Sequence, residues 1–276
     1  MDAFAKIINR QVAWAERQGL RPDANAYLSS VAENLFAPMS KLAEADYRGG
    51  AGNELDDRLG EAAKMRALYS SSALVCNVFD TWRSADADAG AIGRALAISS
   101  ALASVRFEAQ LPSGLRGTPP TLDLLLVASD SLAWGVESKF TEPFQGRQAH
   151  APFVETYFKN DIGLWAALGL PKCQDLADRI NWGVIKFVHL DAAQLLKHAL
   201  GLRRKYEDGQ LVLLWFNVEA PIAESLATEI REFSRSVDST LGFRAVTYQD
   251  VFARLSQEST ANPAHVNYLH SRYFAA

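Results

Sequence analysis

Two short stretches, Pro120-Thr121-Leu122-Asp123 and Val136-Glu137-Ser138-Lys139, decide the fold of this chain. Each carries acidic residues next to or inside an apolar run, and a small polar segment around Asp130 separates the two runs. Apolar runs of this length on either side of a polar turn predict the two strands of a β-hairpin. A turn centred on Asp130 places Asp123 opposite Glu137, with the two side chains roughly 5 Å apart on one face of the sheet.

Two carboxylates in this position repel each other. At a separation of about 4 Å and an effective dielectric of about 20, the repulsion is roughly 4 kcal/mol. A positive group between Asp123 and Glu137 would offset it. Because side chains alternate along a strand, Lys139 emerges on the same face as Glu137, while Ser138 points away. The pattern therefore predicts a divalent-metal site with an ammonium group beside it.

Composition restricts the class of protein. The chain has 276 residues, of which 49% are hydrophobic and 22% charged, and these values are typical of one large globular domain. No apolar run is long enough for a membrane span, and the N-terminus lacks the pattern of a secretory signal. Cys76 and Cys173 have no metal-type spacing, so we expect reduced thiols and a cytoplasmic location, with no membrane partner.

The net charge of −4 argues against a protein that coats nucleic acid through charge alone. It does not exclude an enzyme that contacts phosphates locally, because a bound metal supplies positive charge where it is needed. No Gly-x-Ser-x-Gly elbow and no Gly-x-x-x-x-Gly-Lys motif is present, which weakens the case for a serine hydrolase and for an intrinsic ATPase.

The order of the expected elements predicts an α/β (α+β) fold, with a mixed central sheet flanked by helices. The glycine-rich segment 49–53 reads as a loop that ends an N-terminal helical extension, residues 1–50, before a main domain, residues 51–276. We expect helices over 1–48 with a break and restart at Pro22, and over 54–79, 90–103, 153–168, 192–206, 223–237 and 265–270. We expect strands over 104–111, 122–127, 132–140, 182–188, 211–216 and 243–248.

This pattern resembles the PD-(D/E)xK nuclease superfamily, whose core has a helix, three antiparallel strands, a helix and a further strand. Asp123 matches the first acid of its motif, and Glu137-Ser138-Lys139 matches the second part. More narrowly, the chain resembles bacterial restriction-endonuclease-like proteins of the PGN_0703 type. One departure is that the proline directly before the acid is absent, since Leu122 precedes Asp123 and Pro120 lies three residues back.

The resemblance implies a role for each matching residue. Asp123, Glu137 and the backbone carbonyl of Ser138 would bind Mg²⁺, for which Mn²⁺ would substitute, and Lys139 would position or deprotonate the attacking water. Elementary chemistry agrees, because Mg²⁺ prefers oxygen ligands, keeps several waters and is usually held by one or two carboxylates. The motif does not indicate whether one or two metal ions act.

Further residues are candidates for the same site. Glu108 lies on the preceding strand, where relatives often have another acid that faces the metal; the alternative is an exposed strand acid. Gln194 and His198 share one helix face, and a glutamine on this helix contacts the active site in several relatives; the alternative is a polar stripe on an amphipathic helix. Glu54 could serve the site, although capping of a helix that begins there is the expected role.

We therefore predict a Mg²⁺-dependent DNA endonuclease that acts in bacterial defence by restriction. Two alternatives stay open: a catalytically inactive nuclease-fold protein that serves binding or assembly, and a repair or RNA nuclease of the same fold. Cleavage of both strands of a duplex would favour a homodimer, which no sequence feature demonstrates.

Overall fold

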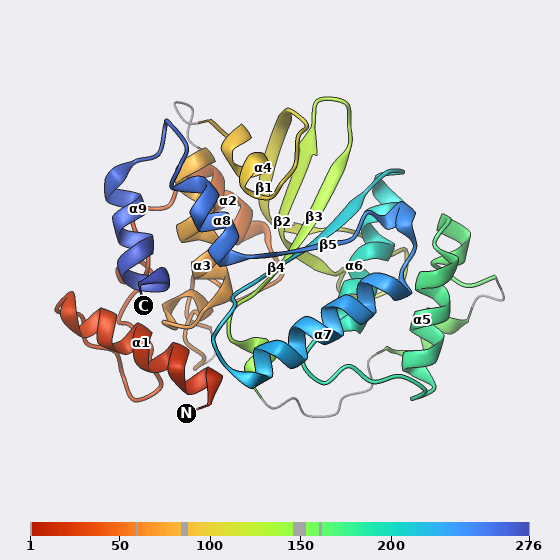
Figure 1. Cartoon of the computed structure of the whole chain (residues 1–276), viewed down its shortest axis with the longest axis horizontal. Coiled ribbons are helices and arrows are strands. Elements are labelled where there is room, and N and C mark those ends of the chain that lie inside the picture. Colours follow the sequence, from red (N-terminus) through yellow and green to blue (C-terminus); the bar gives the residue numbers. More distant parts are fainter. Residues whose placement is uncertain (1, 59, 84–87, 146–152, 160–161, 276) are drawn as a thin grey trace.

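One mixed five-stranded sheet forms the centre of the molecule (Figure 1). The computed structural model describes residues 2–58, 60–83, 88–145, 153–159 and 162–275. The strands lie in the order β1-β2-β3-β4-β5; their bounds are β1 Leu102–Gln110, β2 Thr121–Ala128, β3 Ala133–Lys139, β4 Gln210–Trp215 and β5 Arg244–Thr247. Strands β1 to β3 are an antiparallel meander, whereas β4 is parallel to β3 and β5 is parallel to β4. The predicted α/β fold with a mixed sheet is confirmed.

Helices flank this sheet. Their bounds are α1 Ala3–Arg17, α2 Lys41–Gly49, α3 Ser71–Phe79, α4 Gly90–Ala95, α5 Pro171–Asn181, α6 Ala192–Lys205, α7 Pro221–Ser236, α8 Tyr248–Leu255 and α9 Pro263–Leu269. In the view of Figure 1, α5, α6 and α7 gather at one side of the molecule, and the other helices gather at the opposite side. Helix α6 connects the parallel strands β3 and β4 and packs against both.

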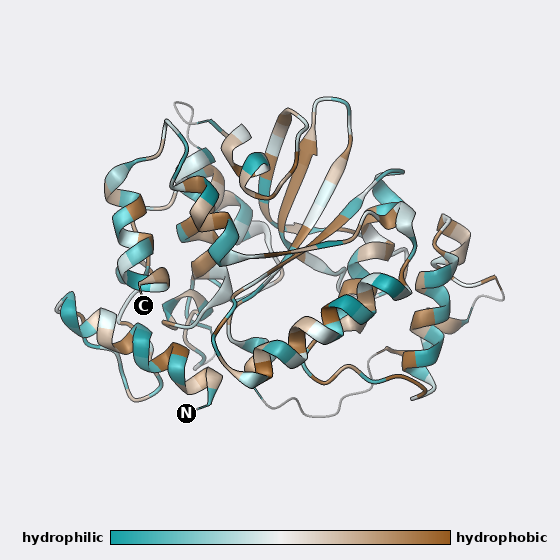
Figure 2. Cartoon of the chain, viewed as in Figure 1, coloured by the Kyte–Doolittle hydropathy of each residue, from teal (hydrophilic) through white to brown (hydrophobic). Residues whose placement is uncertain are grey.

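The apolar pattern of the sequence accounts for the layers. Leu124, Leu125 and Leu126 of β2 are all buried, as is the run from Leu211 to Leu214 in β4. Strands with apolar residues on both faces must be covered on both faces, which the helices do. Figure 2 shows hydrophobic residues concentrated in the central strands, while α7 carries hydrophobic and hydrophilic residues in alternating bands.

Short polar side chains fix where several helices begin. The Ser40 and Ser70 side chains accept hydrogen bonds from backbone N–H groups in the first turns of α2 and α3. Asp191 and Asn262 do the same for α6 and α9. These caps satisfy N–H groups that have no partner within the helix.

The N-terminal third of the chain is less helical than the sequence predicts. The expected restart at Pro22 is wrong, because residues 18–40 contain no α-helix and only a 3-10 turn at Ala32–Asn34. The helix expected over 54–79 is confined to α3. Backbone groups of residues 54–70 instead bond to distant partners, such as Leu68 N–H to the carbonyl of Ala26 (2.9 Å). Tertiary hydrogen bonds of this kind override local helix propensity.

Three further expectations fail in detail. The segment expected to be helical over 90–103 is α4 followed by the start of β1, and residues 182–188 form no strand. Within 153–168, the described residues form 3-10 turns at Glu155–Phe158 and Ala166–Leu168, while 160–161 lie outside the description. The apolar spacing that suggests a helix there serves an aromatic cluster around Trp165. Helices α5 and α8 are not predicted at all.

A buried arginine joins the two ends of the chain, which lie near each other in Figure 1. Arg272 is 0% exposed and follows α9. Its guanidinium donates to the Gln11 side chain of α1 (2.9 Å), the Asn34 carbonyl (2.8 Å) and the Tyr268 hydroxyl (2.6 Å). Residues 2–50 thus pack on the rest of the molecule; the status of residues 1–50 as a separate extension stays a prediction. In the described ranges, no helix is long and apolar enough to cross a membrane.

We predict that Arg272→Met destabilises the protein by on the order of 3 kcal/mol, because buried acceptors on Gln11 and Asn34 lose their donor. Urea unfolding measures the change. Arg17→Met, at the exposed end of α1, is the matched control and should change the free energy of unfolding by less than about 0.5 kcal/mol. Equal effects of the two substitutions would contradict the assigned role of Arg272.

Candidate active site

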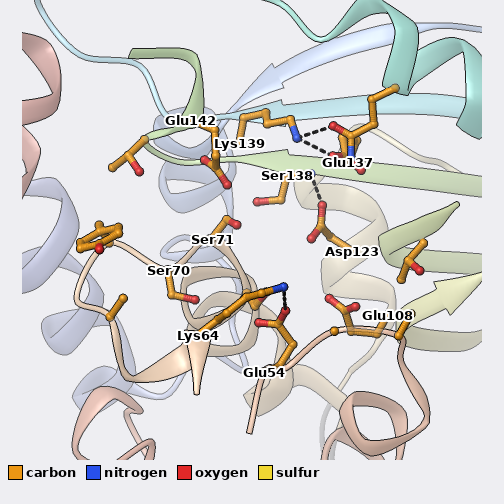
Figure 3. A pocket seen from close by; sticks show the side chains of 18 of the residues that line it. Glu54, Lys64, Ser70, Ser71, Glu108, Asp123, Glu137, Ser138, Lys139 and Glu142 are labelled. Carbon is orange, nitrogen blue, oxygen red and sulfur yellow. Dashed lines mark hydrogen bonds and ion pairs between the residues drawn. The ribbon is translucent and has the colours of Figure 1, made fainter. Parts of the chain in front are cut away.

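A pocket of about 530 Å³ lies beside the sheet, on the face that carries Glu137 and Lys139 (Figure 3). Side chains from β1, β2, β3 and α6 form one wall, and the loop after α2 together with the start of α3 forms the opposite wall. Five of the sequence-predicted residues reach this pocket together with Ser138: Glu108, Asp123, Glu137, Lys139 and Gln194.

Three carboxylates form a row across the meander. Pairing of Phe107 with Leu124 and of Ala109 with Leu122 places Glu108 opposite Asp123. The β2–β3 register ends at Leu124 with Val136, and its extension by one residue places Asp123 opposite Glu137, as the hairpin turn predicts. Side chains directly opposite each other on one sheet face are close neighbours, so the row concentrates negative charge at one point.

Asp123 is the centre of this row. Its Oδ2 accepts a hydrogen bond from the backbone N–H of Ser138 at 2.7 Å. Burial raises the pKa of Asp123 well above its ordinary range, and the charges of Glu137 and Glu108 raise it further. The ionised carboxylate is thus poorly compensated by the protein itself, and a cation next to it would be stabilising.

Glu137 lies between two basic groups. Lys139 Nζ donates to Glu137 Oε1 at 2.6 Å, and His198 Nε2 lies 2.9 Å from Oε2 without the alignment of a hydrogen bond. Glu137 is 2% exposed, and burial alone would raise its pKa, but Lys139 and His198 outweigh burial and hold it at about 2. Glu137 is therefore ionised at neutral pH.

The Lys139 ammonium is firmly charged. Burial would lower its pKa, but Glu137, Glu142 and Asp123 raise it above the ordinary value. Nζ also donates to Gln194 Oε1 at 2.8 Å. An ammonium has three donors, so the bonds to Glu137 and Gln194 leave one for a water or a phosphate oxygen in the pocket.

Helix α6 carries Gln194, the partner of Lys139, and His198, one of the two basic neighbours of Glu137. Gln194 is in its first turn, where the Asp191 side chain caps the Gln194 N–H at 3.0 Å, and His198 follows one turn later. The predicted common face of Gln194 and His198 is thus the face that contacts Lys139 and Glu137. His198 is 1% exposed and does not line the pocket, so it supports Glu137 from behind.

Glu108 has a strained backbone, with φ of 46° in the middle of β1. Non-glycine residues adopt this region at a cost, and such residues are common at functional sites. Gly50 permits the arrangement, because a Cβ there would lie 2.9 Å from the Glu108 Cβ. Burial, followed by the charge of Glu54, raises the pKa of Glu108 from 4.5 to about 7. The exposed-acid alternative for Glu108 is wrong.

Glu54 also belongs to the pocket, and its expected role as a helix cap is wrong, because no α-helix begins there. Its side chain is 6% exposed; Oε1 accepts from Lys64 Nζ at 3.1 Å, and Oε2 has no hydrogen-bond partner. Figure 3 shows Glu54 and Lys64 across the pocket from Glu137. Lys64 and Glu142 also line the pocket, although the sequence analysis names neither as a site residue. Lys64 falls within a wrongly predicted helix.

The side chain and the backbone of Ser138 contact different parts of the molecule. Its side chain lies on the far face, where Oγ and the Tyr248 hydroxyl of α8 are 2.6 Å apart. Its backbone N–H points to Asp123, and in a strand the carbonyl of the same residue points to the same side. The Lys139 carbonyl accepts from Phe216 N–H instead. The Ser138 carbonyl therefore lies on the Asp123 side, as the predicted ligand role requires.

The donor set suits a hard divalent cation. Among the described residues, no group of three or more His, Cys, Asp or Glu side chains is arranged as a complete metal site. Two carboxylates, of Asp123 and Glu137, and the backbone carbonyl of Ser138 supply oxygen donors, and Mg²⁺ commonly completes its shell with water and substrate. The poorly compensated Asp123 carboxylate fits this use.

Comparison with known proteins gives one match. A family model described as restriction endonuclease associating with ARP matches residues 51–274. No curated protein and no solved structure matches the chain. Of the described residues that line the pocket, only Tyr27 lies outside the matched segment. The match is to a restriction-endonuclease family and not to the PGN_0703-type group.

We predict that Glu108→Gln stabilises the metal-free protein above neutral pH. The pKa of Glu108 is raised to about 7 in the folded protein, so its ionisation costs stability as pH rises from about 4.5 to 7. The substitution should add on the order of 1–3 kcal/mol at pH above about 8 and little below pH about 4. Thermal melts in EDTA measure this. Glu16→Gln, on the exposed surface of α1, should show no such trend; a pH-independent difference at Glu108 would contradict the assignment.

Proposed function

The chain belongs to the family described as restriction endonuclease associating with ARP, and on this premise we propose that it is a PD-(D/E)xK nuclease that hydrolyses phosphodiester bonds of DNA with Mg²⁺. The observation that carries the proposal is the contact set of Asp123, Glu137 and Lys139 in one pocket. These residue types in this order are the motif of that superfamily. Restriction of foreign DNA is the proposed biological role.

Asp123, Glu137 and the Ser138 carbonyl would hold Mg²⁺, with Mn²⁺ as a substitute. When bound, the ion neutralises charge on the phosphate and lowers the pKa of a coordinated water. The chain's own residues do the rest. His198 and Lys139 keep Glu137 ionised and oriented, and Gln194 fixes the Lys139 ammonium, whose third donor can orient the attacking water.

Glu108 and Gln194 are proposed to support catalysis from opposite sides of this group. With a pKa of about 7, Glu108 can hold or release a proton near neutral pH, next to the Asp123 carboxylate. Gln194 limits the rotation of Lys139. The family description adds association with ARP, which we propose for this chain as well. The free, buried Cys76 and Cys173 are consistent with the proposed cytoplasmic location.

We predict that Lys139→Ala lowers Mg²⁺-dependent cleavage by about 10²–10⁴-fold or more, because the water loses its positioning group. Purified protein is incubated with plasmid, linear duplex and single-stranded DNA plus Mg²⁺ or Mn²⁺, and products are resolved on gels. Lys172→Ala, an exposed lysine of α5, is the matched control.

The same assay separates the alternatives. Cleavage that persists in Lys139→Ala would refute the mechanism. Binding of DNA by a folded wild-type protein that cleaves no substrate would support the inactive binding or assembly protein, and selective cleavage of RNA would support the RNA nuclease.

We predict that Asp123→Asn weakens binding of Mg²⁺ or Mn²⁺ at least about tenfold, because a charged oxygen ligand becomes a neutral amide. Titration calorimetry measures the affinity without any need for turnover. Ser138→Ala is the matched control, since it keeps the backbone carbonyl and removes only the hydroxyl that contacts Tyr248. Unchanged affinity in Asp123→Asn, or a comparable loss in a folded Ser138→Ala protein, would count against the ligand assignment.

A further inference from the structure

The wall of the pocket away from the sheet carries two aromatic rings beside the Glu54–Lys64 ion pair. Tyr27 and Tyr69 line the same cavity as Asp123, Glu137 and Lys139. Their rings meet edge to face, with centroids 6.0 Å apart and planes at 90°. We propose that Tyr27 and Tyr69 form a base-binding subsite that stacks one unpaired nucleobase of single-stranded DNA beside the phosphate that is cut. This inference rests on the proposed function and specifies the substrate of the same site.

The Tyr27 ring is held in place by its backbone. Its N–H donates to the Asp23 side chain at 2.9 Å, and its carbonyl accepts from the Asp23 N–H at 2.8 Å. On either side, Leu28 N–H donates to Arg66 and Leu68 N–H donates to Ala26, both at 2.9 Å. These bonds fix the Tyr27 backbone, and the edge-to-face contact with Tyr69 restricts rotation of the ring, so the ring loses little conformational freedom when a ligand stacks on it.

Tyr69 is anchored through the same pairing. It lies between Leu68, which is bonded to residue 26, and Ser70, which caps α3. The Phe4 ring of α1 packs on Tyr69 at a centroid distance of 6.1 Å. Burial raises the pKa of Tyr69 to about 12, so the phenol is neutral at physiological pH. The Tyr69 ring therefore offers an uncharged surface to a ligand.

The two walls differ in the chemistry that they offer. The sheet wall carries Asp123, Glu137 and Lys139, which suit a metal ion and a phosphate. The tyrosine wall carries rings, on which a base of any identity can stack. A nucleotide has the same division, with an anionic phosphate at one end and a neutral aromatic base at the other. A bound nucleotide would therefore place its phosphate at the sheet wall and its base at the tyrosines.

The size of the cavity favours an unpaired strand. Glu137 is 2% exposed, and the cavity of about 530 Å³ is in the range that holds a single small ligand. A base inside a duplex is stacked on both sides by its neighbours, so it cannot stack on a tyrosine without leaving the helix. Single-stranded DNA brings a base and its phosphate into the pocket without that cost.

Tyr27 lies outside the segment that the family model matches, residues 51–274. The N-terminal region therefore completes the pocket rather than only extending the chain. It also distinguishes the subsite from the metal-binding row, because every carboxylate of that row falls inside the matched segment.

The test measures binding in the Lys139→Ala background with Mg²⁺, by fluorescence anisotropy of a labelled single-stranded oligonucleotide and of the same sequence as a duplex. Tyr27→Leu and Tyr69→Leu should each raise the Kd for the single strand by roughly 5- to 150-fold, the range that stacking of one base gives. Tyr27→Phe and Tyr69→Phe keep the rings and should stay within about threefold of the parent. Tyr206→Leu, at the end of α6 and away from the pocket, controls for loss of a tyrosine elsewhere.

Three outcomes overturn the subsite: unchanged single-strand Kd values in folded Tyr27→Leu and Tyr69→Leu proteins, an equal loss in Tyr206→Leu, or tighter binding of the duplex than of the single strand. Cleavage by the protein with native Lys139 is scored separately. A protein that cleaves DNA but ignores both leucine substitutions refutes only the subsite. A protein that binds single strands through the tyrosines but never cleaves refutes only the proposed function.

Discussion

The buried ion pair between Glu137 and Lys139 is the interaction on which the site depends. Both side chains are almost fully enclosed, and an ionised group in such a place must have partners. The contact of 2.6 Å supplies one partner to each, and α6 supplies the next, with Gln194 at Lys139 and His198 close to Glu137. The position of α6 on the sheet therefore places one side chain that keeps Glu137 ionised and one that accepts a hydrogen bond from Lys139.

Glu137 also belongs to the row of three carboxylates on the sheet. Glu108, Asp123 and Glu137 lie opposite one another on three adjacent strands, although like charges in that arrangement destabilise a sheet. The strained φ of Glu108 and the raised pKa values of Glu108 and Asp123 are the local signs of this cost. A fold selected only for stability would replace these acids with apolar residues. The proposed function accounts for these acids, because a cation and a phosphate bound at the row would offset their charge.

The pocket is assembled from segments that are distant in the chain. The sheet contributes the charged wall, whereas residues 23–28 and 64–70 pair with each other to build the other wall. Gly50 allows the loop after α2 to approach Glu108 and close the space between the walls. The charged residues of the sheet wall all lie within residues 51–274, the segment that matches the restriction-endonuclease family, whereas Tyr27 of the opposite wall lies outside it.

The sequence alone determined the meander, the register of the hairpin and the common face of Glu137, Lys139 and their partners on α6. Alternation along strands and the period of a helix are local rules, so they can be read from spacing. It did not determine the structure of residues 54–70, the pocket roles of Glu54, Lys64 and Glu142, or the strain at Glu108. Those depend on hydrogen bonds and charges brought together from distant segments, such as residue 26 with 68 and Glu54 with Glu108. Only the tertiary structure decides such contacts, because no local period in the chain encodes which distant groups will share one desolvated space.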